Sequence, residues 1–574
     1  PAMLEIFRDR DRLPRRNLVP WAGEFAGKYL TSAVQVLRLT GDPGLRAGVA
    51  AFVEELISLQ ADDGYLGPWP RACRLTGAAP NVMGKEGSTW DAWGHYHLML
   101  GLLLWHEDGG GDAALSAASR IGDLLCRRFL GRHRVRLVDT GSTEMNLAPV
   151  HSLCLLYRRT GTQRYLDLAL QLVEEFSAEG ADGPLAGDYL RVALAGREFF
   201  QGPKPRWESL HPIMGLVELY WLTGEERYRT AFEQIWWSIA QLDRHNNGGF
   251  SSGEQAQGNP YHQGAIETCC TIAWMALSVE MLRLTGDPVV ADELELSTLN
   301  SGLGLLSRTG RWCTYNTPMD GLRRASGHEI VFQAREGSPE LNCCSVNGPR
   351  GLGLINDWAV MRDADGLVLN WFGPGRVTVP LRPGLTVGLE QETEYPCQGR
   401  VRLTVSPSRS SEFTLKVRVP HWSADTAVRV NGKRQPAPTA GYLALDRTWR
   451  RGDRIDLDLD LSLHYWAGEQ ECRGRTSIFR GPVLLTYDRR LNEVDPHRVP
   501  VLDAADLEGE LVETGGWLPV IEALSFPAAG GKRLVLCDYA SAGQGGSPYA
   551  SWLRVRHAPR TLFSPAHPLR SARP

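Results

Sequence analysis

A short turn sequence recurs along the first two thirds of this chain, each time at the end of an apolar segment. It reads LRLTGD at 37–42, YRRTGT at 157–162, YWLTGE at 220–225 and LRLTGD at 282–287. The last three copies are about sixty residues apart, and the glycines of WHEDGGGD at 105–112 stand where a copy is missing. Glycine suits the left-handed residue that ends a helix. The repeat therefore predicts a series of helical hairpins.

The two helices of each hairpin differ in their apolar pattern. The first, as in HYHLMLGLLLW and IAWMALSVEMLRL, is apolar nearly all round, whereas the second, as in RYLDLALQLVEEF, is amphipathic. Helices that are apolar all round are buried, and amphipathic helices face solvent. Five hairpins are visible, and a sixth inner helix fits at 348–361. We therefore predict an (α/α)6 toroid over residues 1–361, with an open helical solenoid as the alternative.

The apolar period changes to two after residue 361, as in antiparallel strands with one buried face. The strand-like segments are FTLKVRV (413–419), RIDLDLDLSL (454–463), IFRGPVLLTYD (478–488) and KRLVLCDY (532–539). We predict an antiparallel β-sandwich over 362–464 and a second, smaller β-sandwich over 465–574. The expected fold class is thus a multidomain α and β protein.

Composition excludes several classes of function. The 574 residues are 43% hydrophobic and 22% charged, with a formal net charge of −4. This balance offers no basic surface for nucleic acid, and no apolar run reaches the roughly 18 residues that span a membrane. The N-terminal PAMLEIFRDRDRLPRRN lacks the apolar segment of a secretory signal. We therefore expect a cytoplasmic protein, and we keep open a homodimer formed through the β units.

Polar side chains begin each otherwise apolar inner helix. In chain order they are Glu24; His95 and His97; Glu144 and Asn146; His211; Glu267, Cys269 and Cys270; and Cys343, Cys344 and Asn347. In a toroid these helix ends converge on one central pocket, so together they predict the functional site. Each histidine or glutamate taken singly is equally typical of a core or capping residue.

The cysteines are the most specific of these features. There are 11, an odd number, scattered without the spacing of a disulfide framework. Glu267, Cys269 and the pair Cys343–Cys344 begin neighbouring inner helices, and three thiolates with one carboxylate suit tetrahedral Zn²⁺. The alternatives are cysteines that act as small core residues and a closed structural zinc site.

A loop rich in glycine, serine and asparagine, NNGGFSSGEQAQGNPYHQG at 246–264, precedes the fifth inner helix. Loops on a rigid scaffold commonly carry function. Glu254 is the one acidic residue in this loop, and near the pocket it could protonate a leaving oxygen and then activate water. The alternative is a solvated loop carboxylate.

These motifs resemble glycoside hydrolase family 127, whose best-known activity is that of a β-L-arabinofuranosidase. The resemblance rests on GE in the glycine-rich loop, on ETC at 267–269, and on CC at 343–344 followed by asparagine and arginine. Weaker matches are GKYL near the start, QADDGYLG at 60–67, YNTP at 315–318 and RGPVLLTYD in the second β unit. The family implies an (α/α)6 barrel with β-sandwich domains.

The resemblance also assigns roles to residues of this chain. It implies that Glu267, Cys269, Cys343 and Cys344 bind zinc, that Cys343 is the nucleophile of a retaining mechanism, and that Glu254 is the general acid/base. It places Tyr315, His95 and His211 around the sugar. We add Glu144, at the start of the third inner helix, to the expected substrate-binding residues.

Some residues depart from the family pattern. The chain has CCSVN where the family commonly has CCPPN, and Ser142 where a histidine is expected. The segment from Glu254 to Glu267 is three residues shorter than expected.

From the motifs and the resemblance together, we predict a retaining exo-glycosidase acting on a non-reducing-end pentofuranose or related sugar of an oligosaccharide or glycoconjugate. The alternatives are a toroid epimerase or lyase that uses pocket histidines, and a non-catalytic carbohydrate-binding protein with structural zinc.

Overall fold

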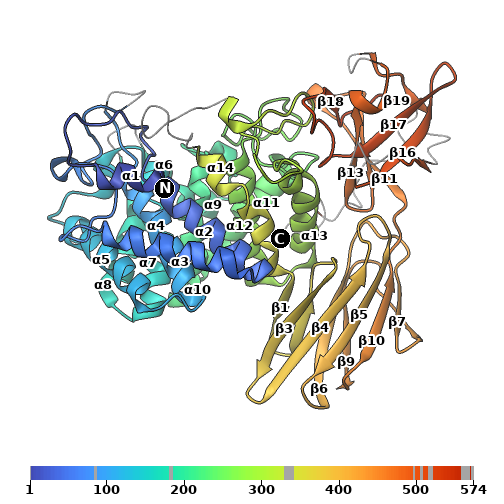
Figure 1. The fold of residues 1–574 in the computed structure, drawn as a ribbon, viewed down its shortest axis with the longest axis horizontal. Helices are drawn as coiled ribbons and strands as arrows, with labels where there is room; N and C mark the ends of the chain where they lie inside the picture. Colours follow the sequence, from blue (N-terminus) through green and yellow to red (C-terminus); the bar gives the residue numbers. More distant parts are fainter. Residues whose placement is uncertain are drawn as a thin grey trace.

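The computed structural model describes residues 2–82, 87–179, 185–328, 342–494, 498–503, 509–514, 521–556 and 569. Figure 1 shows a helical part on the left, one β unit at the lower right and a second β unit at the upper right. Helices predominate up to Trp358, and strands follow from Val360. Within the described ranges, no helix has the length and apolar character needed to cross a membrane.

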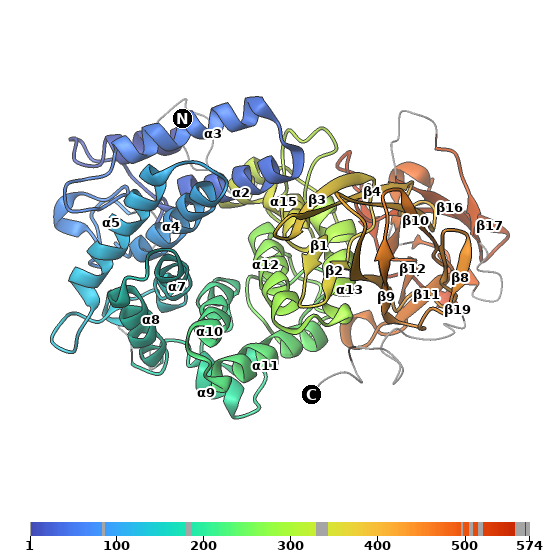
Figure 2. The same cartoon turned by 90° about the horizontal axis from the view of Figure 1, so that it is seen from below.

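The inner helices form a closed ring, as predicted. They are α2 (Glu24–Thr40), α4 (Asp91–Glu107), α7 (Pro149–Thr160), α10 (Leu210–Thr223) and α12 (Thr268–Thr285). Each contacts the next in this order, and α15 (Arg350–Gly353) contacts both α12 and α2. Figure 2 shows this ring from below. The contact between α15 and α2 closes the ring and excludes the open solenoid.

Amphipathic helices surround the ring and pack on the inner helices that precede them. They are α3 (Pro43–Ser58), α5 (Asp112–Phe129), α8 (Gln163–Glu175), α11 (Glu226–Leu242) and α13 (Pro288–Ser297). The expected glycine turns are confirmed, because Gly41, Gly161, Gly224 and Gly286 end their helices with φ of 65°, 65°, 72° and 63°. The 105–112 segment connects α4 to α5, as expected for the missing copy.

The sixth inner element differs from the prediction of one helix over 348–361. It is broken into α14 (Cys343–Asn347), α15 and α16 (Ile355–Trp358), and β1 begins at Val360. Pro349 cannot donate a backbone hydrogen bond, and glycine disfavours a helix interior. Gly353 is needed where it stands, since a Cβ there would lie 3.0 Å from the backbone carbon of Gln35 in α2. The glycines thus allow the close contact that closes the ring, at the expense of helical continuity.

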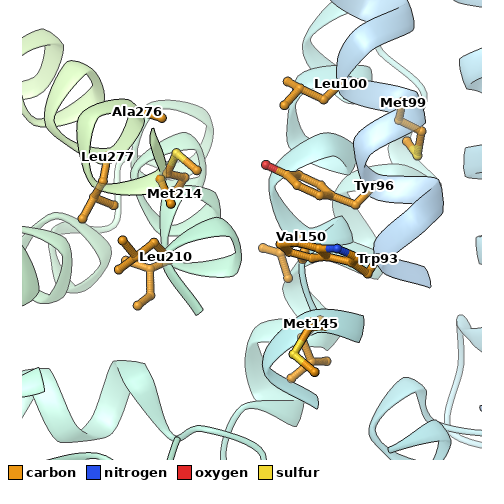
Figure 3. Close-up of a cluster of buried hydrophobic side chains, with 14 of the residues drawn as sticks. Trp93, Tyr96, Met99, Leu100, Met145, Val150, Leu210, Met214, Ala276 and Leu277 are labelled. Carbon is orange, nitrogen blue, oxygen red and sulfur yellow. The ribbon is translucent and has the colours of Figure 1, made fainter. Parts of the chain in front are cut away.

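The centre of the ring is a packed core. Figure 3 shows Trp93 and Tyr96 of α4 on one side and Leu210 and Met214 of α10 on the other. All four side chains are at most 2% exposed and belong to one apolar cluster. Because these side chains fill the axis of the ring, the inner helices form a rigid base at their N-terminal ends.

The first β unit is a sandwich of two sheets. One has the order β1 (Val360–Arg362), β2 (Gly366–Leu369), β6 (Ser411–Val419) and β9 (Gly441–Trp449); the other has the order β3 (Gly375–Arg382), β4 (Leu385–Thr393), β5 (Arg400–Pro407), β10 (Asp453–Asp458), β7 (Ala427–Val430) and β8 (Lys433–Gln435). Side chains of both sheets share one core. The pairing is antiparallel except between β2 and β6. The strand expected over 454–463 ends earlier, at Asp458.

The second β unit begins at Leu463, and its nine described strands pair into one connected sheet. They are β11 (Leu463–Ala467), β12 (Thr476–Arg480), β13 (Val483–Asp488), β14 (Leu502–Asp503), β15 (Glu510–Leu511), β16 (Ala523–Ala528), β17 (Lys532–Asp538), β18 (Tyr549–Ala550) and β19 (Val555–Arg556). The strand-like segment 478–488 lies in the β12–β13 hairpin. Residues 557–568 and 570–574 lie outside the described part of the predicted unit.

Candidate functional site

The N-terminal ends of the inner helices open on a cavity of about 960 Å³. Its lining comes from segments far apart in the chain, including Glu24, Glu144, Glu254, Tyr315 and Cys343. The closed ring brings these segments together, because each precedes or begins an inner helix or lies in a neighbouring loop. Of the residues predicted to converge at one end of the ring, Glu24, Glu144, Glu267 and Cys343 line this cavity.

Four of the predicted residues form one buried group, namely Glu267, Cys269, Cys343 and Cys344, whose ligand atoms all lie within 4.8 Å of one another. Glu267 is the N-cap of α12 and Cys269 lies in its first turn. The two other cysteines begin α14, where the Asn342 side chain accepts a hydrogen bond of 2.9 Å from the Cys344 backbone N–H. The contact between α12 and α14 brings the two pairs together.

The spacing within this group fits a tetrahedral metal ion. Two sulfur ligands about 2.3 Å from a tetrahedral centre lie about 3.8 Å apart. The Sγ atom of Cys344 is 3.8 Å from that of Cys269 and 3.8 Å from that of Cys343. Glu267 Oε1 is 3.3 Å from Cys344 Sγ and 3.7 Å from Cys343 Sγ, close to the roughly 3.5 Å that a sulfur–oxygen pair needs. The four side chains could therefore hold a metal ion.

The three thiols of the group differ in their surroundings. Cys343 lines the cavity and is 8% exposed, whereas Cys269 and Cys344 are fully buried. Cys269 is 3.7 Å from the Lys28 ammonium and 3.5 Å from the Asn347 amide, which both donate toward its sulfur. Cys343 is therefore the thiol that a molecule in the cavity can reach.

Glu254 occupies a tight turn that aims its side chain into the cavity. Its φ of 65° places it in the left-handed region. One carboxylate oxygen accepts a hydrogen bond of 2.8 Å from Arg206, and the other accepts one of 3.3 Å from the Tyr315 hydroxyl. Burial and the neighbouring Glu267 raise the pKa of Tyr315, so the phenol keeps the proton that it donates.

Arg206 also pairs with Glu208, through contacts of 2.8 and 3.0 Å. Glu208 is only 1% exposed, and burial raises the pKa of its carboxyl to about 7, although Arg206 opposes the shift. Arg206 thus lies between a buried carboxylate and the cavity-facing Glu254.

The second β unit holds the loops that carry Glu254 and Tyr315. At the start of the first loop, Asn246 donates hydrogen bonds to Ser477 and Ser551, at 2.7 and 2.9 Å. After Tyr315, the hydroxyls of Tyr539 and Tyr549 donate to the carbonyl of Pro318. These contacts explain how irregular loops are fixed beside the barrel.

Two predicted substrate-binding residues line the cavity, and two do not. Glu144 and Tyr315 are lining residues, and Glu144 lies 3.2 Å from the Lys204 ammonium. His95 is fully buried, accepts a hydrogen bond from the Leu66 backbone and packs on Tyr65. His211 is 2% exposed and forms a 2.9 Å hydrogen bond with Tyr96. Burial lowers the pKa of His211, so the ring is a neutral core group.

Several lining residues were missed by the sequence analysis. They are Trp21, Lys204, Arg206, Trp207 and Glu208. Four of them lie in KPRWES at 204–209, directly before the fourth inner helix. The dense mixture of charged and aromatic residues directly before an inner helix is the sequence signal that indicates these residues.

The chain was compared with known families and structures. Residues 7–355 match the family described as "Beta-L-arabinofuranosidase, GH127 catalytic domain", and residues 366–461 match its "GH127 middle domain". None of the curated protein sequences compared matches the chain.

Solved structures share the fold over nearly the whole length. Ara127N, a GH127 β-L-arabinofuranosidase from Geobacillus stearothermophilus T6, is 20% identical with a TM-score of 0.75, over 97% of this chain and 94% of its own. The GH127 β-arabinofuranosidase BT3674 is also 20% identical, with a TM-score of 0.78 over 97% and 91% of the two chains. A further structure named only as a glycoside hydrolase is 21% identical, with a TM-score of 0.73 over 93% and 92%.

Proposed function

Because this chain belongs to glycoside hydrolase family 127, it is a glycosidase, and we propose that it is a retaining exo-glycosidase with Cys343 as its nucleophile. The observation that carries the proposal is the position of Cys343. It is the cavity-facing thiol of a buried group suited to a metal ion, and Glu254 lines the same cavity. A thiol and a carboxyl group at one cavity are the two groups that a two-step displacement requires.

We propose zinc as the metal, held by Glu267, Cys269, Cys343 and Cys344. When bound, zinc supplies a positive charge that keeps the thiol of Cys343 ionised at neutral pH. Sulfur-rich ligand sets with this tetrahedral spacing favour zinc over calcium or magnesium, which prefer oxygen ligands.

In the first step, the Cys343 sulfur attacks the anomeric carbon of the sugar. A carbon–sulfur bond forms with the electron pair of the thiolate, and the glycosidic carbon–oxygen bond breaks. Glu254 gives its proton to the departing oxygen, so the leaving group departs as an alcohol. The products are a glycosyl-cysteine, a Glu254 carboxylate and the free aglycone.

In the second step, Glu254 removes a proton from water. The water oxygen bonds to the anomeric carbon, and the carbon–sulfur bond breaks to return the thiolate. Two inversions give net retention. Arg206 and Tyr315 hold the Glu254 carboxyl in both steps through their hydrogen bonds.

We propose a terminal pentofuranose or a related sugar of an oligosaccharide or glycoconjugate as the substrate. The support is the family, whose described activity is that of a β-L-arabinofuranosidase. Glu144 and Tyr315 supply polar groups for sugar hydroxyls from two sides of the cavity. Trp21 and Trp90, whose ring centroids are 5.2 Å apart, add aromatic surface to the lining of the same cavity.

The test is hydrolysis of a panel of aryl furanosides and pyranosides by the wild type and by Cys343→Ala. The expected result is release from a β-L-arabinofuranoside or a close relative, lost by at least about a thousandfold in the variant. Cys126→Ala, which removes a buried thiol on the outer helix α5, is the matched control. Turnover that survives Cys343→Ala would exclude the cysteine nucleophile.

A further inference from the structure

We infer that Arg206 is the positioning residue for Glu254: it fixes the carboxyl group in the cavity, while Glu208 anchors the guanidinium. The inference rests on the proposed acid/base role of Glu254. It goes beyond that role because it names the groups that tune it.

The geometry of the arginine fork supports this assignment. The Nε and one Nη atom of Arg206 bind the two oxygens of Glu208 at 3.0 and 2.8 Å. The same Nη atom binds Glu254 at 2.8 Å. A bidentate pair fixes the plane of a guanidinium. Because Glu208 is 1% exposed and Glu254 is 34% exposed in its side chain, the buried carboxylate is the anchor and the exposed one is positioned.

The backbone places the two residues in register. Arg206 and Gln255 form an antiparallel bridge. The Trp207 N–H donates to the carbonyl of Glu254 at 3.3 Å, and the Ala256 N–H donates to that of Pro205 at 2.9 Å. The turn at Glu254 is therefore fastened to the segment that carries Arg206, and the side-chain contact follows from this pairing.

The charges around Glu254 explain why two partners are needed. Arg206 and the Tyr315 hydroxyl donate to its two carboxylate oxygens, and Glu208 and Glu267 are neighbouring acidic groups. Glu144 and Lys204 form a further pair on the cavity wall. An adjacent guanidinium alone lowers a carboxyl pKa by about 1–3 units. Glu208 and Glu254 share one guanidinium nitrogen of Arg206, so neither carboxylate has that charge to itself.

The test is the pH dependence of kcat/KM for Arg206→Met and Glu208→Gln. The alkaline limb of this profile reports the protonated acid of the free enzyme. Loss of the guanidinium should move this limb up by about 1 pH unit and lower kcat by about 10–100-fold. Glu208→Gln keeps an oxygen acceptor but removes the negative charge that Glu208 carries above its pKa of about 7, so it should move a limb in that range down. Arg206→Lys should restore part of the wild-type profile.

A purely structural role would not give shifts in opposite directions. Arg227→Met, which removes an exposed pair with Glu225, is the control and should leave the profile unchanged. Coincident limbs in Arg206→Met, Glu208→Gln and the wild type would overturn the inference.

The variant Glu254→Ala distinguishes failure of the inference about Arg206 from failure of the proposed acid/base role of Glu254. If Glu254 is the acid/base, azide should restore turnover of aryl substrates, because azide attacks the intermediate without a base. Azide rescue together with coincident limbs removes only the role of Arg206. Full activity of Glu254→Ala without azide removes the acid/base assignment itself.

Discussion

The ammonium nitrogen of Lys28 lies 3.7 Å from the Sγ atom of Cys269 and 3.0 Å from a carboxylate oxygen of Glu24. All three side chains are almost fully buried. Burial alone would lower the pKa of Lys28, but Cys269 and Glu24 raise it above its usual value, so the lysine stays charged. The first inner helix therefore supplies a counter-charge to the thiolate group on the fifth and sixth.

Lys28→Met should destabilise the protein strongly, because it leaves the Glu24 carboxylate buried without its ion-pair partner. Removal of one member of a buried pair costs about 3–5 kcal/mol. Glu24→Gln in the same chain should recover a large part of the loss, since its amide oxygen can still accept the hydrogen bond from the Trp93 indole. Urea denaturation of both single variants and the double variant measures this coupling, and additive losses would contradict it.

The enzyme should contain one tightly bound metal ion per chain. Its removal with a chelator should abolish activity and lower the melting temperature, because a ligand that binds only the folded state stabilises that state. Metal analysis, an activity assay and a melting curve measure the three effects. Cys344→Ala should lose the metal and Cys126→Ala should keep it; equal metal content in both would exclude the proposed ligand set.

The close contact of the inner helices α2 and α4 should be sensitive to a single methyl group. A Cβ on Gly27 would overlap the backbone of His97 and lie 2.5 Å from the Leu98 nitrogen. Gly27→Ala should therefore destabilise by about 2–4 kcal/mol. Gly48→Ala on α3 meets open space and should stabilise by about 0.5–1 kcal/mol. Thermal melting of the two variants compares them, and similar shifts would contradict the close packing.

A buried carboxyl group in the second β unit should give the stability a defined pH dependence. Burial raises the pKa of Glu522 to about 7, despite its pairing with Arg480. Between the usual pKa of about 4.3 and this value, the folded chain holds a proton that the unfolded chain has lost. The free energy of unfolding therefore falls as pH rises through this window, by at most about 4 kcal/mol, and is level above it.

Glu522→Gln should remove this component of the pH dependence. Melting temperatures between pH 4.5 and 8 should then decline less than in the wild type. Glu510→Gln, which removes an exposed pair with Arg533 in the same unit, should keep the wild-type decline. Parallel curves for Glu522→Gln and the wild type would show that this carboxyl group does not titrate as described.

Much of the barrel could be predicted from the sequence because its signals are local. The TGD-type turns and the contrast between apolar and amphipathic helices specify each hairpin, and Gly41 and its counterparts adopt the expected conformation. The group of one glutamate and three cysteines that could hold a metal ion was predictable for a related reason. Glu267 with Cys269, and Cys343 with Cys344, each begin an inner element, and ring closure brings the two elements together.

The rest of the site depends on information that local patterns do not contain. Helix α4 is apolar on every side, so its sequence gives no rotational setting, and His95 turns toward Tyr65 instead of the cavity. The contact of Arg206 with Glu254 joins two irregular segments through a β-bridge. Neither segment carries a periodic pattern that would indicate this pairing. The prediction of one helix for the sixth inner element was wrong. Gly353 lies in a close contact with α2, and this contact is not visible in the sequence.

The most direct test of the account is the mass of the enzyme quenched during turnover of an aryl glycoside with a good leaving group. Glu254→Gln should be used, because it lacks the base that hydrolyses the intermediate and should accumulate it. The account predicts an added mass of one sugar residue, located by peptide mapping on Cys343 and absent from Cys343→Ala. A modified carboxylate, or steady turnover with no adduct on Cys343 in the Glu254 variant, would contradict the cysteine nucleophile.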